Sequence, residues 1–425
     1  MQPPPTPPAG ETQRDAAVDG DDGTIGPPRL SLVRLFWRFL RFGLLAWGGP
    51  VAQIGLLRAE LVDDERWVAP ARFNRVLSVY QVLPGPEATE LCIYFGQLAR
   101  GRIGGLVAGL AFMLPGFALM LAIAAAYVQW GVQGAVVAGV LVGMQAGASA
   151  LVVRATSRIA RHALTGRLLW VLAGFGAALT LAGVHFALVL VATGTLYTLA
   201  RRGRAREALL MAVLIAAAGV AALVHDGGSE LLVVQQATGS AATSGGKPAS
   251  PGELLWSGFQ AGSLTFGGAY TSIPFVQHDA VVQGGWASPQ QFLDGLALGS
   301  VLPAPLIIFT TFVGYLAGGL DGAAAITFGI FLPAFAITLL GHGRLERLVD
   351  DVRVHYLLDG ITAGVVGLIG VTAAGLVLTA VRGGPVAVPV IVVAVVVLER
   401  WQSRWALLAV MVASGIAGLV VGLPA

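Results

Sequence analysis

The chain has 425 residues, of which 56% are hydrophobic and only 12% are charged. An average soluble domain carries about a quarter charged residues, so this composition excludes an ordinary soluble protein. The formal net charge of +3 is too small to indicate a nucleic-acid-binding protein, and the single cysteine, Cys92, excludes an intramolecular disulfide. We predict an all-α polytopic membrane protein that lies within a lipid bilayer.

Residues 1–30 are rich in proline, glycine and aspartate and lack the apolar core of a signal peptide. We predict that they form a disordered tail. A helix needs roughly 20 apolar residues to cross a bilayer, and on this basis the rest of the chain contains about 12–13 membrane segments, two or three of them open to a re-entrant interpretation. These segments lie near residues 31–62, 73–99, 103–129, 133–153, 168–182, 185–200, 207–224, 253–283, 291–316, 322–341, 354–380, 386–398 and 405–423.

The second of these segments is interrupted at its middle by Pro84, Gly85 and Pro86. Proline lacks a backbone N–H and glycine adopts conformations that other residues avoid, so the helix must unwind there. A new helix is predicted to begin near Pro86 or Glu87. Its N-terminus would lie inside the membrane, where its N–H groups attract an anion. Irregular backbone at this depth is tolerated only inside protein or beside a wet cavity.

Positive charges indicate how the segments are oriented. Arginines cluster at 154–167 and again at 201–206, and such clusters favour the cytoplasmic side of a membrane. Residues 225–252 are instead rich in glycine, serine and alanine, which is typical of a flexible linker. We predict that this linker lies on the outer side.

The linker separates two segments of related sequence, 31–224 and 253–424. When GLLAWGGP at 43–50 is set over GSLTFGGA at 262–269, the offset is 219 residues, and it also places QVLPGP at 81–86 over SVLPAP at 300–305. The first segment contains an odd number of predicted crossings, so the second enters the membrane from the opposite side. Inverted repeats with interrupted helices at matching positions indicate a secondary transporter whose site lies near the bilayer midplane.

The second break consists of Pro303, Ala304 and Pro305. We predict that it faces the first break across a pseudo-two-fold axis, with a small oxyanion between the two helix N-termini. Nearby amides and hydroxyls can donate hydrogen bonds to the oxygens of such an ion. Capping of the broken helices is the structural alternative for each of these side chains. They are Gln81, Ser300, Thr310 and Thr311.

Two glycine pairs precede the breaks, Gly48-Gly49 and Gly267-Gly268. Small residues let neighbouring helices pack closely, so tight packing is the favoured interpretation of both pairs. Direct contact between their backbone and the substrate is the alternative.

Two acidic residues follow the first break. Glu87 falls in the first turn of the new helix, where the helix dipole favours a carboxylate, so a structural cap is its main interpretation. Glu90 lies three residues further on. An acid inside a membrane is costly and therefore indicates a function, either coupling of anion movement to protons or pairing with an arginine. Structural capping is the alternative for Glu90.

These motifs resemble those of the chromate ion transporter family. The resemblance is carried by FGLLAWGGPVAQI at 42–54, LPGPEATELCIYFGQL at 83–98 and LPAPLIIFTTFVGYLAGG at 302–319, and it extends over about residues 31–424. It implies a multi-pass inner-membrane protein that exports chromate, with sulfate as a related oxyanion and with two homologous domains in opposite orientations. One residue departs from the pattern, because the second break has Ala304 where the first has Gly85.

The sequence lacks the motifs of other functional classes. The chain has no Walker phosphate loop, and its histidines show no metal-protease spacing, so no ATP hydrolysis, catalytic residue, metal or cofactor is expected. A passive anion channel would use the same helix N-termini and stays an alternative, as does a transporter for uptake of sulfate or another oxyanion. Proton coupling and a homodimeric state are left open.

Overall fold

The structure is a computed structural model that describes residues 26–131, 134–225, 249–266, 268–349, 352–384, 386–401, 403 and 405–422. Within this part of the chain every regular element is a helix, which confirms the predicted all-α class. Most of the predicted N-terminal tail and most of the predicted linker lie outside the described residues. We call residues 26–225 the first half and residues 249–422 the second half.

The first half contains eight α-helices and one π-helix, η1, in its described residues. They are α1 (Leu32–Leu44), α2 (Gly49–Arg58), η1 (Ala59–Asp64), α3 (Pro70–Val82), α4 (Glu87–Trp130), α5 (Ala135–Ala163), α6 (Arg167–Leu181), α7 (Phe186–Arg201) and α8 (Ala205–His225). Helix α5 continues ten residues beyond the predicted segment 133–153, so Arg154, Arg158 and Arg161 of the first arginine cluster lie within the helix and not after its end.

The second half follows the same order. Its elements are α10 (Pro251–Ser263), η2 (Ala269–Ser272), α11 (Ile273–Gln277), η3 (His278–Gln283), α12 (Pro289–Ser300), η4 (Leu306–Ile308), α13 (Phe309–Val349), α14 (Val352–Gly383), α15 (Ala387–Arg400) and α16 (Ala406–Gly422). Both α1 and α10 have 13 residues, both η1 and η3 are six-residue π-helices, and each pair is separated by the offset found in the sequence.

Two of the long helices contain a sharp reversal. In α4 the backbone leaves the helical conformation at Arg100 and at Gly101, where φ is 63°, and α13 does the same at Gly318 and Gly319. The helices on either side fold back on each other, because a Cβ on Gly96 would lie 2.5 Å from the carbonyl oxygen of Gly104. Each element is therefore a short helix followed by a long one, packed backbone to backbone.

Fewer of the described helices have the length and hydropathy needed to cross a membrane than the sequence predicts. Only four described helices are long and apolar enough to do so, namely Glu87–Trp130, Ala135–Ala163, Leu306–Gly341 and Val354–Gly383. The helices α1 and α3 have 13 residues each. At 1.5 Å per residue, such a helix covers only about 20 Å of a hydrocarbon core of about 30 Å. The predicted segment 31–62 thus consists of α1, α2 and most of η1, and the segment 73–99 consists of most of α3 and the start of α4.

Ion pairs show that the chain turns back after α1. Arg38 pairs with Glu60, at 3.1 Å, and with Glu65, and Arg41 pairs with Glu60. Partial burial raises the pKa of Glu65, but hydrogen bonds from Arg38 and Trp67 outweigh it, so the pKa lies below its ordinary value. Residues of η1 and the following loop therefore lie beside α1.

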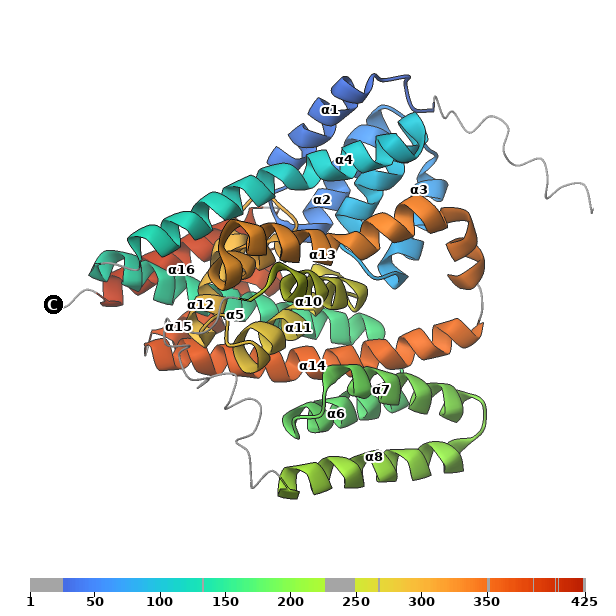
Figure 1. The fold of residues 1–425 in the computed structure, drawn as a ribbon, viewed down its shortest axis with the longest axis vertical. Helices are drawn as coiled ribbons and strands as arrows, with labels where there is room; N and C mark the ends of the chain where they lie inside the picture. Colours follow the sequence, from blue (N-terminus) through green and yellow to red (C-terminus); the bar gives the residue numbers. More distant parts are fainter. Residues whose placement is uncertain are drawn as a thin grey trace, which may run out of the picture.

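The two halves exchange packing partners (Figure 1). Helix α5 packs against α15 and α16 of the second half, and α14 packs against α6 and α7 of the first half. Glycines allow the close approach, since a Cβ on Gly143 would meet the backbone of Ser414 and a Cβ on Gly364 would lie 2.3 Å from the Thr193 hydroxyl. Helices α5 and α14 are therefore packed largely against the opposite half, whereas α4 and α13 also pack on α1 and α10 of their own halves.

Candidate substrate site at the two helix breaks

The first break has the predicted form. Helix α3 ends at Val82, and α4 begins at Glu87 with Pro86 as its N-cap. At the break the backbone N–H of Gly85 donates to the carbonyl oxygen of Thr265 at 3.0 Å, and Pro84 forms an isolated β-bridge with Phe266. The break is thus bonded to the second half of the chain.

The second break differs from the first in detail. Pro305 is the N-cap of a single 3-10 turn, η4, and the regular helix α13 starts only at Phe309. The carbonyl oxygen of Ala304 accepts a hydrogen bond from Nε2 of Gln53 at 3.0 Å, and the same nitrogen donates to Ala46 at 3.1 Å. Gln53 is buried. The sequence reading missed it, although a glutamine one turn beyond a glycine pair in an apolar segment was a usable signal.

The glycine pairs lie at the same meeting point. Gly48 and Gly49 have φ values of 96° and 79°, and Gly268 has a φ of 112°, all in the region that favours glycine. A Cβ on Gly49 would lie 3.6 Å from the Tyr270 hydroxyl, and one on Gly268 would lie 3.5 Å from Oε1 of Glu87. Gly267 lies outside the described residues. The turns around residues 48 and 268 thus join the two breaks at one place in the fold.

The departure at Ala304 has a steric explanation. A Cβ on Gly85 would lie 2.9 Å from the methyl group of Ala334, whereas a Cβ on Gly116 would lie 2.3 Å from the methyl group of Ala304. Gly116 and Ala334 are themselves matching positions, in LPGF and LPAF. Each crossing therefore accommodates one methyl group. At the second break it belongs to Ala304 of the break itself, and at the first break it belongs to Ala334 of the facing helix α13.

This pairing makes a testable prediction about packing. We expect Gly116→Ala to destabilise the protein by about 1–3 kcal/mol, because the added methyl group overlaps that of Ala304. Adding Ala304→Gly should restore most of the loss, since one methyl group then occupies the crossing again. Thermal unfolding of the two single variants and the double variant in detergent measures this coupling. Additive effects of the two substitutions would contradict the steric explanation.

The predicted hydroxyl ligands are already bonded within the protein. Ser300 donates to the carbonyl oxygen of Ala297 at 2.7 Å, Thr310 donates to Ile307 at 2.9 Å, and Thr311 and Thr327 share a hydrogen bond of 2.8 Å. All four side chains are buried, whereas Gln81 is exposed. Their predicted contact with a substrate stays a prediction. The bonds observed run to carbonyl oxygens three residues earlier and between two threonines, and they are not the helix caps of the structural alternative.

The two acids lie against the first break. Oε1 of Glu90 would lie 2.7 Å from a Cβ on Gly85, so its carboxyl group folds back over the break. Glu90 is 0% exposed, and neither of its carboxyl oxygens has a hydrogen-bond partner within the described residues. Oε2 of Glu87 also lacks one there. The start of α4 therefore holds two buried carboxyl groups with few hydrogen bonds among the described residues to offset the cost of burying them.

The helices before the two breaks have different surroundings. In α12, Asp294 is buried and accepts hydrogen bonds of 2.8 Å from both Gln145 of α5 and Tyr127 of α4. In α3, the residue at the matching position is Arg75, and it is exposed. The same exposed face of α3 carries Asn74, Ser78 and Gln81, which lead along the helix to the break.

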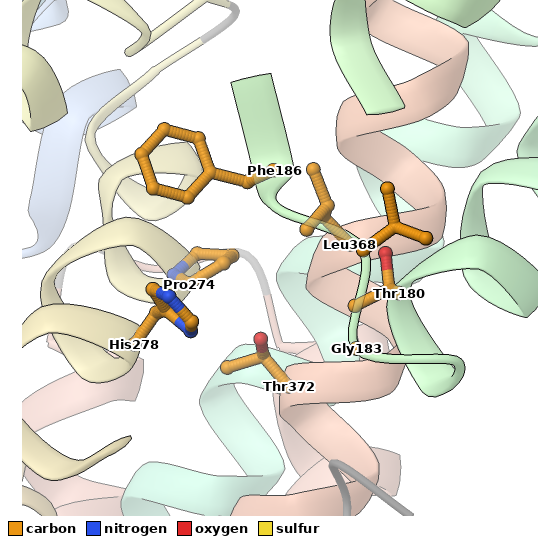
Figure 2. A pocket seen from close by; sticks show the side chains of 8 residues that line it. Thr180, Gly183, Phe186, Pro274, His278, Leu368 and Thr372 are labelled. Carbon is orange, nitrogen blue, oxygen red and sulfur yellow. The ribbon is translucent and has the colours of Figure 1, made fainter. Parts of the chain in front are cut away.

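A small pocket lies apart from the breaks, between the α6–α7 loop and helices α11 and α14 (Figure 2). Its lining residues are Thr180, Gly183, Val184, Phe186, Pro274, His278, Leu368 and Thr372. The lining is largely apolar, and the Thr180 hydroxyl is bonded to the carbonyl oxygen of Gly176. The lining contains no arginine or lysine, so this pocket lacks the fixed positive charge that would favour a dianion.

Comparison with known proteins identifies the family. The family model described as "Chromate transporter" matches residues 33–220 and 252–419. The chain is 47% identical to the "Chromate transport protein" of Pseudomonas aeruginosa over 93% of this chain and 94% of that protein. It is 29% identical to the "Chromate transport protein" of Cupriavidus metallidurans over 80% of this chain and 82% of that one. No solved structure matches the chain significantly. Family motifs and helices long enough to cross a membrane thus agree, and the chain belongs to the chromate transporter family.

Proposed function

We propose that this protein is a secondary transporter that exports chromate, or a related tetrahedral oxyanion such as sulfate, across the inner membrane and thereby confers chromate resistance. The observation that carries the proposal is that each helix break is hydrogen-bonded to a segment beside the glycine turn of the opposite half. Gly85 donates to Thr265, and Gln53 donates to Ala304. A helix N-terminus at such a point, inside an apolar protein, suits a small anion. Names of the relatives point to chromate as the first substrate to test.

Contacts that recur between the halves support an inverted repeat of residues 31–224 and 253–424, joined by a linker at 225–252. Gly85 and Ala334 face each other at the first break, and the residues at the matching positions, Ala304 and Gly116, face each other at the second break. In the same way, α5 packs on α15 and α16, and its counterpart α14 packs on α6 and α7. Reciprocal contacts of this kind are what a two-fold axis between two copies produces.

The unequal surroundings of α3 and α12 favour a transporter over a passive channel. A face of α12 that includes Asp294 is covered by α5, while the matching face of α3 is exposed. A transporter with two related halves alternates between states in which one half and then the other is closed. A channel would need the path to be open beside both helices at once.

The membrane potential is sufficient to drive export. Moving one elementary charge across about 100 mV is worth about 2.3 kcal/mol, so a dianion leaving a negative interior gains about 4.6 kcal/mol. Outward movement of chromate is therefore downhill without ATP. Uptake of the same ion against this potential would require a coupling ion.

The difference in exposure between α3 and α12 can be tested directly by cysteine labelling. In a Cys92→Ala background, which is otherwise free of cysteine, we expect Ser78→Cys to react quickly with a charged thiol reagent, because Ser78 is exposed on a polar face. Ala297→Cys at the matching position of α12 should react at least about tenfold more slowly, since Ala297 is 0% exposed. Labelling in inside-out and right-side-out vesicles then identifies the open side, which we expect to be cytoplasmic. Equal rates at the two positions would remove the support for alternation.

The function itself is tested with purified protein in proteoliposomes. Labelled chromate should leave vesicles that carry a negative interior potential, and chromate outside should accelerate this efflux by exchange. A panel of sulfate, molybdate and phosphate as competitors identifies the substrate among the oxyanions. A channel would show no acceleration by exchange, and an uptake transporter would accumulate the ion only when a coupling gradient is supplied.

A further inference from the structure

A buried polar cluster ties α12 to the first half of the chain. Helix α12 packs on α5 and also contacts α4. The carboxyl group of Asp294 accepts one hydrogen bond of 2.8 Å at Oδ2 from the Tyr127 hydroxyl and one of 2.8 Å at Oδ1 from Nε2 of Gln145. Tyr127 belongs to α4 and Gln145 to α5. Each carboxyl oxygen therefore has its own donor from a separate helix of the opposite half.

The surroundings of this cluster hold its members in place. The ring of Tyr127 packs edge-on against Phe312, with 4.9 Å between the ring centroids. Asp294 and Gln145 are both buried, and Oε1 of Gln145 has no hydrogen-bond partner within the described residues. A buried acceptor that loses its donor costs more free energy than an average hydrogen bond contributes. The two bonds to Asp294 therefore help to determine whether α12 stays covered by α5.

The first half lacks an equivalent cluster. On α3 the residue that matches Asp294 is Arg75, which is exposed. Gly143 of α5 and Gly364 of α14 occupy matching places, because each lets its helix pack closely on the opposite half. Two residues beyond these glycines stand Gln145 and Val366, so valine replaces the amide donor. Arginine cannot accept these bonds and valine cannot donate them. Covering α3 therefore gains no hydrogen bonds of this kind.

We propose that Tyr127, Gln145 and Asp294 form a latch that holds the transporter in the state with α12 covered and α3 exposed. The proposal rests on the alternation in the proposed function and deepens it, because it names the side chains that set the resting state. For α12 to open, water must replace the two donors at the Asp294 carboxyl group. A latch in one half only stabilises one state only, so the protein without substrate rests with the side of α3 open. We expect this side to be the cytoplasm, where an exporter binds its substrate.

Cysteine labelling without substrate tests the latch. In the cysteine-free background, the reaction rate of Ala297→Cys reports the opening of α12, because Ala297 is fully buried. Tyr127→Phe keeps the ring and Gln145→Met keeps the length of the side chain, but each removes one donor. We expect each to raise the labelling rate at least about fivefold, because the covered state alone loses a hydrogen bond. Ser149→Ala is the matched control on α5. Its hydroxyl donates to the carbonyl oxygens of Gln145 and Leu376 and makes no bond to α12, so the rate should stay unchanged.

An exchange of donor and acceptor distinguishes the hydrogen bond from packing. Gln145→Glu places a second carboxyl group against Asp294, and two like charges repel each other, so the labelling rate of Ala297→Cys should rise. Adding Asp294→Asn provides an amide that donates to the new carboxyl group and still accepts from Tyr127. The rate in this double variant should return to within about twofold of normal.

The outcomes separate the latch from the proposed function. Unchanged labelling in folded Tyr127→Phe and Gln145→Met would overturn the latch and leave the proposed function standing. Faster labelling of Gln145→Glu that Asp294→Asn does not reverse would indicate loosened packing and would overturn the latch as well. The expected labelling rates, together with no chromate transport by the unaltered protein, would support the latch and overturn the proposed substrate. Should Gln145→Met fail to fold, as judged by gel filtration, Tyr127→Phe decides the test.

Discussion

Replacing Gly85 with alanine is expected to abolish oxyanion binding while the protein still inserts and folds. Gly85 has a φ of 152°, a conformation that costs other residues about 1–3 kcal/mol. Its new methyl group would also lie 2.7 Å from Oε1 of Glu90 and 2.9 Å from the methyl group of Ala334. The break must then shift, which separates the Gly85 N–H from Thr265 and moves the start of α4. We expect a loss of affinity of more than about tenfold, measured by equilibrium binding of labelled chromate.

The matching position in the second half provides the control. Ala304 does not have a positive φ, so Ala304→Gly releases no strain and only removes a methyl group. Binding by this variant should stay within about a factor of three of normal, because glycine at an unstrained position costs up to about 1 kcal/mol. Full-strength binding by Gly85→Ala, with folding confirmed by circular dichroism and gel filtration, would mean that the substrate sits elsewhere and that the break serves only as a hinge.

Glu90→Gln is expected to flatten the pH dependence of transport. Glu90 is fully buried and its carboxyl group has no hydrogen-bond partner among the described residues, which makes its ionised form costly, so we propose that Glu90 exchanges a proton during the transport cycle. Glutamine has almost the same shape but cannot release a proton. Chromate efflux from proteoliposomes, measured over about pH 5–8, should therefore vary much less in the variant than in the unaltered protein.

Glu87 supplies the comparison for this experiment. Its carboxyl group lies at the first residue of α4, where the helix dipole favours a carboxylate. We expect Glu87→Gln mainly to lower thermal stability, by about 0.3–1 kcal/mol for the lost interaction of its carboxylate with the helix dipole, and to keep the pH profile. If Glu90→Gln leaves the profile unchanged, Glu90 has a structural role, and if Glu87→Gln flattens it, the proton is carried by that residue instead.

The sequence was informative where covalent chemistry dictates the backbone. Pro84 and Pro86 cannot continue a helix, so the break and the start of the next helix could be predicted to within a residue. Matching motifs in the two halves predicted the second break in the same way. Proline positions are local information, and no distant contact is needed to interpret them.

Hydropathy was less informative about how the chain passes through the membrane. An apolar segment such as 31–62 has the length of a crossing, but it consists of α1, α2 and η1, with a turn at Gly48 and Gly49. The reversal at Arg100 and Gly101 was hidden for the same reason, because apolar residues continue on both sides of it. The mean hydropathy of a segment cannot distinguish a chain that crosses the membrane from one that turns back within it.

Side-chain roles at the site depended on contacts that a single sequence does not contain. Thr310 and Thr311 were plausible ligands by position, yet their hydroxyls bond to Ile307 and Thr327. Gln53 was overlooked although it bonds to the second break, 251 residues away. Such partners are determined by packing between the halves.

The exchange of packing partners between the halves has a consequence for biosynthesis. Helix α5 leaves the ribosome early, but α15 and α16, against which it packs, are made more than 220 residues later. Until then the glycine-lined face of α5 around Gly143 can be covered only by lipid or by an insertion factor. The helices must therefore enter the bilayer one by one and assemble afterwards, so that the nascent chain acquires its native packing only near the end of translation.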